Sequence, residues 1–215
     1  MNSKILDLAN FLDFHGTRYI TFLSFALNYA AGGFNTFGYH LTNVVIHILN
    51  SIMVYFLITL IFQTPAMKPA GYGVLTPRIE YVALAVSLVF ISHPIQTQAV
   101  SYIVQRFASL ATFFYLLSVL TYVKARLIYT SRNTAEGQSK SFLLPYAVSI
   151  VSAALAMKTK EISFTLPFII ALCEFVFFSA GEKLSVRFLF LSPFLLTLLI
   201  IPLVSQAFHR RAEWM

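Results

Sequence analysis

The feature that most constrains this 215-residue chain is a run of 49 residues, 19–67, without a single Asp, Glu, Lys or Arg. A helix needs about 20 apolar residues to span a bilayer, so an uncharged run of this length predicts burial in a membrane. Polar side chains nevertheless interrupt it at spacings of 3, 4 and 3, which places them on one helical face: His40, Asn43, His47 and Asn50. Because polar groups at membrane depth normally face a protein interior or a wet cavity, we expect an integral membrane protein that encloses a polar site.

The composition agrees with a membrane protein and excludes several other classes. Hydrophobic residues make up 58% of the chain and charged residues 11%, against about 45–50% and about 25% in soluble domains. The net charge of +7 comes from basic residues scattered over short loops, whereas nucleic-acid binding needs a clustered cationic face. The single cysteine, Cys173, lies in an apolar segment and argues against a disulfide framework or a thiolate metal site. We therefore expect the lipid bilayer as a partner and no nucleic acid.

The apolar segments, separated by Pro, Gly and charged residues, predict an all-α polytopic bundle of about six spans with additional interfacial helices. Residues 1–33 are expected to form helices on the external membrane surface, and residues 34–215 the transmembrane bundle. The predicted spans cover about 34–62, 79–93, 104–126, 142–157, 162–180 and 188–208.

Alternation of these spans places the loops 63–78, 124–141 and 181–187 on one side of the membrane. The longest basic loop, 124–141, favours that side as the cytoplasmic one. All of the unusual polar clusters then fall on the opposite, external or luminal face.

Two interpretations of the polar stripe remain open. Its side chains could line a cavity for a polar substrate or headgroup, or they could hydrogen-bond neighbouring helices, as Asn and His often do in membranes. We weigh the second interpretation most for His47 and Asn50, and we assign three residues nearer the start of the helix to a candidate binding site: Tyr39, His40 and Asn43. Metal binding is disfavoured because the two histidines are seven residues apart with no carboxylate or thiolate between them.

The segment 93–106 carries the densest polar cluster, with His93, Gln98, Tyr102 and Arg106 as candidate binding residues. His93 precedes a proline, which suits the first turn of a new helix. Arg106 stands at the start of an uncharged core, so it must either snorkel to the interface or meet an anion. Its guanidinium group has the geometry for bidentate phosphate binding.

A short charged turn joins two apolar segments and adds three candidate binding residues, Lys158, Lys160 and Glu161. These charges complement the dipoles of the flanking helices, and the two lysines could also clamp a lipid phosphate. Arg18 opens a helix beside the polar face and is a further candidate for contact with an anion. Glu174, deep within its predicted span, is expected to have a structural partner rather than a catalytic role.

Three ordered motifs resemble the membrane region of the transmembrane and tetratricopeptide-repeat O-mannosyltransferases and their bacterial relatives: residues 18–47, 93–106 and 157–161. The resemblance implies the C-type glycosyltransferase fold, a multi-pass protein of the bacterial inner membrane or the endoplasmic reticulum membrane whose active site faces outward or into the lumen. It implies transfer of a sugar such as mannose from a polyprenyl-phosphate carrier to an acceptor, commonly a protein Ser or Thr hydroxyl. It also implies that the matching cationic residues surround the donor: Arg18, His40, His93, Arg106, Lys158 and Lys160.

The family pattern also implies a further span and an acidic pair before the first motif, which supply a general base or ligate a divalent metal. Only Asp7 and Asp13 precede that motif here, so the catalytic residues stay unassigned and the chain is expected to be a fragment. No cofactor is identified, and a divalent metal would enter only together with such an acidic pair. Two non-enzymatic alternatives remain: a transporter or flippase-like protein for a lipid-linked or small polar substrate, and a non-catalytic membrane scaffold.

Overall fold

The structure, a computed structural model, describes residues 18–67, 76–132, 141–178 and 183–199. Every regular element within these ranges is a helix, so the all-α class is confirmed. The elements are α2 (Tyr19–Gly32), α3 (Thr36–Ile61), α4 (Thr76–Ser92), η4 (Pro94–Gln96), α5 (Thr97–Ser101), η5 (Ile103–Gln105), α6 (Arg106–Arg132), α7 (Leu143–Thr159), η6 (Glu161–Thr165), α8 (Leu166–Phe177) and α9 (Leu184–Thr197). The surface helix predicted before residue 18 and the end of the span predicted at 188–208 lie outside the described residues.

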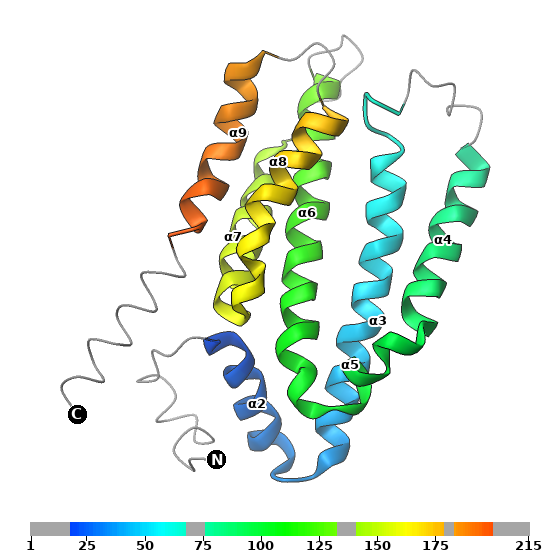
Figure 1. The fold of residues 1–215 in the computed structure, drawn as a ribbon, viewed down its shortest axis with the longest axis vertical. Coiled ribbons are helices and arrows are strands. Elements are labelled where there is room, and N and C mark those ends of the chain that lie inside the picture. The colour runs from blue at the N-terminus through cyan, green and yellow to red at the C-terminus, as the bar shows by residue number, and fades with distance from the viewer. Residues whose placement is uncertain (1–17, 68–75, 133–140, 179–182, 200–215) are drawn as a thin grey trace, which may run out of the picture.

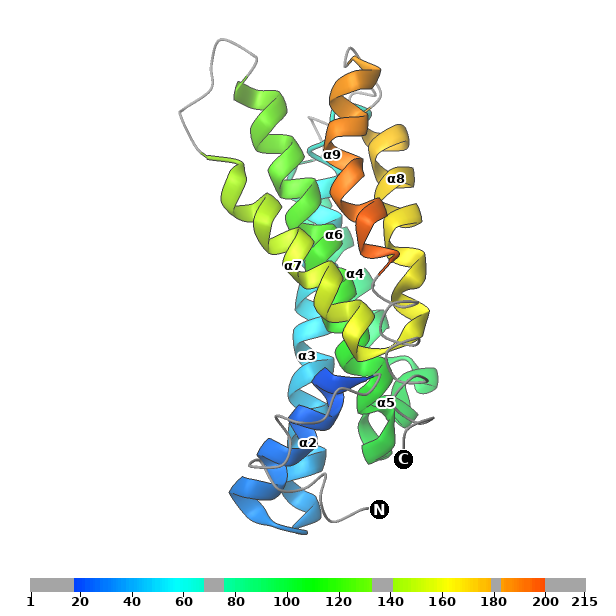
Figure 2. The same cartoon turned by 90° about the vertical axis from the view of Figure 1, so that its left-hand side faces the viewer.

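Local sequence signals set several helix ends. Gly33 adopts a φ of 60° after α2, and its N–H donates to the carbonyl of Tyr29 at 2.7 Å. Asn35 caps α3, because its Oδ1 accepts from the backbone N–H of Phe37 at 3.0 Å. The turn between these residues reverses the chain, so α2 lies alongside the first part of α3 (Figure 2).

The long helix α6 occupies the centre of the bundle, with α7 and α3 as its main neighbours and α4 on the outer side of α3 (Figure 1). The short helices α8 and α9 contact each other on the other side of α6. The lower part of the molecule in Figure 1 holds α2, α5 and the starts of α3 and α6, and the junction of α7 with η6 bounds it from above, next to the start of α2. We call this end the α2 end.

Two helices of the described residues are long and apolar enough to cross a membrane: Thr36–Ile61 and Ile103–Ser131. A third span results if the bent pair Arg78–Ser92 and Pro94–Ser101, with a bend of 50°, is counted as one. Many large apolar side chains stay exposed on the outer faces, among them Phe56, Val89 and Leu172. Such a surface is typical of a membrane protein, since lipid rather than water surrounds it. The number of six spans stays a prediction.

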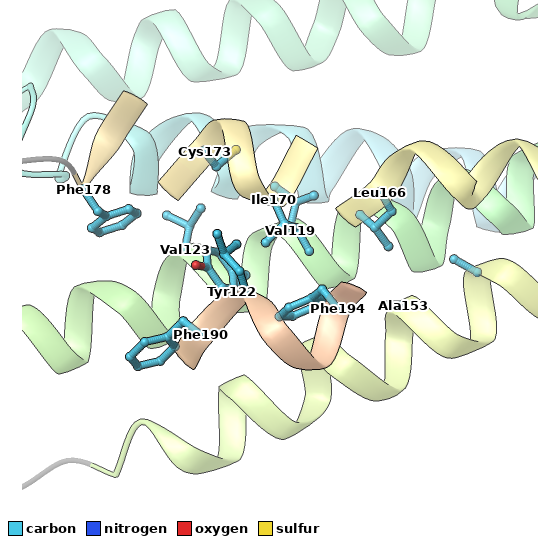
Figure 3. Packing of buried hydrophobic residues seen from close by; sticks show 12 residues of the cluster. Val119, Tyr122, Val123, Ala153, Leu166, Ile170, Cys173, Phe178, Phe190 and Phe194 are labelled. Carbon is cyan, nitrogen blue, oxygen red and sulfur yellow. The ribbon is translucent and has the colours of Figure 1, made fainter. Parts of the chain in front are cut away.

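The apolar core lies where α6, α7, α8 and α9 meet (Figure 3). Tyr122, Ile170 and Phe194 are fully buried in it, and the rings of Tyr122 and Phe194 make an edge contact with centroids 5.5 Å apart. Alanines of α7 let this helix approach α6 closely, because a small side chain holds the backbones apart least.

A buried ion pair crosses this core and corrects one prediction. Residues 124–132, expected in a cytoplasmic loop, continue α6, and Arg126 is fully buried. Its Nη2 lies 2.7 Å from Oε1 of Glu174 in α8, and its Nε lies 2.8 Å from Oε2. The Tyr122 hydroxyl donates to the same Oε2 at 2.7 Å. Glu174 therefore has the structural partner that was expected of it. Arg126, which was expected in a loop, lies in the interior of the bundle.

The polar stripe of α3 faces its helical neighbours. Asn50 donates to the Ser109 carbonyl at 3.0 Å, and His47 Nε2 lies 3.1 Å from the carbonyl of Ile91. Both side chains are buried, so hydrogen bonding between helices, the second interpretation, describes them. Asn43 is also buried, but it belongs to a larger polar cluster at the α2 end.

Candidate functional site at the α2 end

Arg106 is the centre of this cluster. The residue is fully buried at the first turn of α6. Its Nε donates to Asn43 Oδ1 at 2.9 Å, and Nη2 donates to the carbonyl of Tyr39 at 2.8 Å. Nη1 donates to the Ser24 carbonyl at 3.3 Å and also to Asn28 Oδ1. Four of the five guanidinium N–H groups are thus satisfied by protein oxygens, and the side chain does not snorkel to the surface.

All four acceptors around Arg106 are uncharged, since two are amide oxygens and two are backbone carbonyls. The guanidinium carbon also lies over the ring faces of Phe25 and Tyr39, 4.6 and 5.6 Å from their centroids. Aromatic faces stabilise a cation but do not neutralise it. Among the described residues, no carboxylate hydrogen-bonds to this guanidinium, so they leave its positive charge inside the α2 end unneutralised.

Helix α2 supplies the contacts that sequence reasoning missed. Ser24, Phe25 and Asn28 reach Arg106 from one face of this helix, on which Thr21 is buried as well. The sequence does indicate this face of α2, because these positions follow helical spacing and Asn28 is the only side-chain amide in the helix. Asn28 also donates to Thr42 Oγ1 at 3.1 Å, so it joins α2, α3 and α6.

Arg18 and Glu161 form an ion pair at this end. Arg18 Nε lies 3.1 and 3.2 Å from the two carboxylate oxygens of Glu161, and Nη2 lies 3.1 Å from Oε2. Each side chain remains 44% exposed. Burial raises the pKa of Glu161, but hydrogen bonds from Arg18 and its own backbone, with the charges of Arg18 and Lys160, leave that pKa below its ordinary value.

Aromatic rings connect the two arginines. The Arg18 guanidinium lies over the ring of Phe107, 5.5 Å from its centroid, and Phe107 makes an edge contact with Phe25 at 5.8 Å. Phe25 in turn lies beneath Arg106. A continuous line of contacts thus runs from Glu161 at the start of η6, through α2, to Asn43 in α3.

Two other predicted residues, Tyr39 and Tyr102, contact this line of residues mainly through their backbone. Asn43 Nδ2 donates to the Tyr102 carbonyl at 3.2 Å, which fixes the bend between α5 and η5, while the Tyr102 side chain is 58% exposed. Tyr39 is half-buried, and its hydroxyl donates to the carbonyl of Gly33 at 3.0 Å. Recorded contacts thus bring together six of the predicted residues: Arg18, Tyr39, Asn43, Tyr102, Arg106 and Glu161.

Five predicted residues are not joined to that line by side-chain contacts. His93 is exposed and uses Nδ1 to accept from the N–H of Ile95 at 3.2 Å, so it caps η4. Gln98 is exposed on α5, and His40 is half-buried on α3. Lys158 and Lys160 are half-buried at the end of α7, next to Glu161 in sequence.

The arrangement suits an anion better than a metal ion. The described residues contain no group of three His, Cys, Asp or Glu that could hold a metal. Within the part of the chain that the structure describes, the ionic side chains of the α2 end are Arg18, Arg106, Lys158 and Lys160 against Glu161, so positive charge dominates among them. A cationic site flanked by exposed apolar residues such as Ile95 and Val104 can bind a phosphate attached to a lipid.

Comparison with known proteins agrees with the motifs. Human protein O-mannosyl-transferase TMTC4 is 32% identical over 146 residues, which cover 67% of this chain and 19% of the human protein. Mouse protein O-mannosyl-transferase TMTC2 is 39% identical over 102 residues, 47% of this chain and 10% of the relative. The chain is a relative of the TMTC family.

The match to Drosophila protein O-mannosyl-transferase Tmtc1 is the longest of the three, 32% identical over 161 residues, 74% of this chain and 16% of the fly protein. The resemblance drawn from the sequence is thus confirmed, and the chain spans less than a fifth of the length of these TMTC relatives. No family model matches the chain, and no solved structure matches it. The membrane assignment is confirmed by the TMTC relatives together with the apolar helices.

Proposed function

We propose that this chain forms the donor-binding core of a membrane-embedded glycosyltransferase. It takes a sugar, in this proposal mannose, from a polyprenyl-phosphate carrier and transfers it to a Ser or Thr hydroxyl of a protein acceptor. The names of the relatives, protein O-mannosyl-transferases, support the sugar and a protein acceptor. The observation that carries the proposal is the buried charge of Arg106 among uncharged acceptors.

An uncompensated cation inside a membrane protein is costly, and such residues commonly mark a substrate or ion pathway. A bound anion lowers that cost, because an opposite charge nearby offsets the lost hydration of the guanidinium. The positive potential of the α2 end also raises the local concentration of anionic ligands. A polyprenyl-phosphate sugar carries one such charge next to the bond that is broken during transfer.

In this proposal the residues of the α2 end divide into two groups. Those that are exposed or half-buried contact the phosphate and sugar: Arg18, His40, His93, Gln98, Tyr102, Lys158 and Lys160. Arg106 is buried beneath these residues. Asn43 and the Tyr39 carbonyl fix its guanidinium, which in turn joins α2 to α3. Arg106 is then a positioning residue that also supplies charge, rather than a group that grips the phosphate with both amino groups.

The membrane arrangement is part of the same proposal. The short apolar helices Leu143–Thr159 and Leu184–Thr197, together with α8, complete a multi-pass bundle of about six spans with the C-type glycosyltransferase fold. The relatives compared above are animal proteins, which favours the endoplasmic reticulum membrane with the α2 end on the luminal side. They lend no support to the bacterial inner membrane.

Binding of the donor tests this function directly. The purified chain in lipid nanodiscs is titrated with radiolabelled polyprenyl-phosphate-mannose, and saturable binding is expected. Arg106→Ala should weaken binding by about tenfold or more, as expected for loss of a buried charge, whereas Arg106→Lys keeps the charge and should retain part of it. Arg78→Ala removes an exposed arginine at the opposite end of α4 and serves as the control. Equal binding by all four proteins, or none by any, contradicts the proposed function.

A further inference from the structure

We propose that the Glu161 carboxylate is an internal competitor of the ligand at the α2 end, and that Arg18 exchanges this carboxylate for the phosphate of an anionic sugar-phosphate ligand. This inference rests on the proposed function. It turns Glu161, predicted above as part of the donor site, into a group that opposes donor binding.

The geometry of the pair is that of a ligand contact. The Arg18 guanidinium contacts both carboxylate oxygens of Glu161, at 3.1 to 3.2 Å, through Nε and Nη2. A guanidinium edge binds two phosphate oxygens in the same way. The carboxylate thus occupies the edge of Arg18 that a phosphate needs.

The pair is placed where exchange with a ligand costs little. Both side chains are 44% exposed, and ion pairs at this exposure contribute little to stability. The buried pair of Arg126 and Glu174, in contrast, has no exposed surface. Only the first of the two can open towards a dissolved or membrane-bound ligand without disturbing the core.

The surroundings hold Arg18 in place when its partner changes. Its guanidinium rests against the ring of Phe107, and this contact does not involve Glu161. Its backbone adopts a φ of 68°, which is uncommon for a residue with a side chain and belongs to the conformations that cluster at ligand-binding sites. The charge of Lys160 acts on Glu161 and would act equally on a phosphate in its place.

If Glu161 competes with the ligand, removing its charge should raise the affinity for the donor, whereas removing a residue that binds the donor would lower it. Glu161→Gln removes the competing charge and leaves Arg18 and Lys160 available, so the donor should bind more tightly. If the carboxylate occupies Arg18 most of the time in the free protein, its removal should tighten binding by about three- to tenfold. Loss of a true donor ligand would weaken binding instead.

The test compares the wild-type chain with Glu161→Gln in nanodiscs, titrated with polyprenyl-phosphate-mannose and, separately, with mannose 1-phosphate. Tighter binding of both ligands identifies the phosphate as the exchanging group, and tighter binding of the lipid-linked ligand alone assigns the exchange to the membrane-bound donor. Glu80→Gln, an exposed carboxylate near the start of α4, should leave both affinities unchanged.

Two further variants keep the result decisive. Glu161→Asp retains the charge but is one methylene shorter, so it should give an intermediate affinity even where the Gln variant folds poorly. Arg18→Ala combined with Glu161→Gln should abolish the gain. If wild type binds the donor and the single variants Glu161→Gln and Glu161→Asp bind equally or more weakly, the exchange is refuted while the proposed function stands. If no protein binds either ligand, both proposals fail.

Discussion

Replacing Glu174 by Gln should be among the most destabilising single changes in this chain. The carboxylate has no exposed surface, and it accepts hydrogen bonds from Arg126 at 2.7 and 2.8 Å and from the Tyr122 hydroxyl at 2.7 Å. Arg126 is equally buried, and it lies against the ring of Phe190, 4.5 Å from the centroid. The Gln variant therefore leaves a cation in the apolar core without its counter-ion.

The size of the effect follows from the geometry. Charges 2.7 Å apart attract by about 6 kcal/mol at an effective dielectric constant of ~20. The cost of desolvating both ions offsets much of this attraction, so the intact pair contributes little net stability. Removing one partner loses the attraction while the other ion stays desolvated, and such changes cost about 3–5 kcal/mol.

Reversible unfolding in mixed micelles, followed by circular dichroism, measures this quantity. Glu174→Gln should lower the free energy of unfolding by about 3–5 kcal/mol, and the double variant Arg126→Met with Glu174→Met should recover most of the loss, because neither charge remains. If the single and the double variant lose the same stability, or the Gln variant loses less than about 1 kcal/mol, the pair is not a desolvated ionic contact and the reasoning fails.

Two other predictions concern the α2 end. Asn28→Ala removes one acceptor of Arg106 and should lower the free energy of unfolding by about 1.5–3 kcal/mol. Asn28→Asp supplies a counter-charge, so it should stabilise the protein but weaken donor binding. An Asp variant that binds the donor as well as wild type would contradict the role given to the buried charge. The pKa of Glu161 lies below its ordinary value of 4.5, so its ion pair stabilises the contact of η6 with α2 above that pH and is lost as the pH falls through the lowered pKa. The protection of α2 amides from hydrogen exchange, measured against their intrinsic rates at each pH, should therefore fall at acidic pH in the wild type but not in Glu161→Gln. An equal response of both proteins would show that another group titrates.

Much of the architecture could be predicted from local sequence. The glycine pair at 32–33 ends α2 and Asn35 caps α3, and both signals act within a few residues, so the ends of these two helices are local features of the sequence. The stripe of Asn43, His47 and Asn50 likewise predicted a buried polar face, because helical periodicity fixes which side chains point the same way.

The errors came from contacts between residues distant in sequence. Arg126 was placed in a loop because a charge after an apolar segment usually marks its end, yet its partner Glu174 lies 48 residues away. The partners of Arg106 on α2 lie 78 and 82 residues away and become visible only once α2 lies against α3. The candidate anion site was inferred from residue type alone, and only the packed helices show which of its cations is exposed and which is buried.

The most direct test of the central claim is where the donor lies when it is bound. A photoreactive polyprenyl-phosphate-mannose is crosslinked to the chain in nanodiscs, and the modified peptides are identified by mass spectrometry. We predict adducts within residues 93–106 and 157–161, the two segments that end at Arg106 and Glu161, and their loss in excess unlabelled donor. Adducts confined to the opposite end, around Arg78 and Glu80, would contradict a donor site at the α2 end.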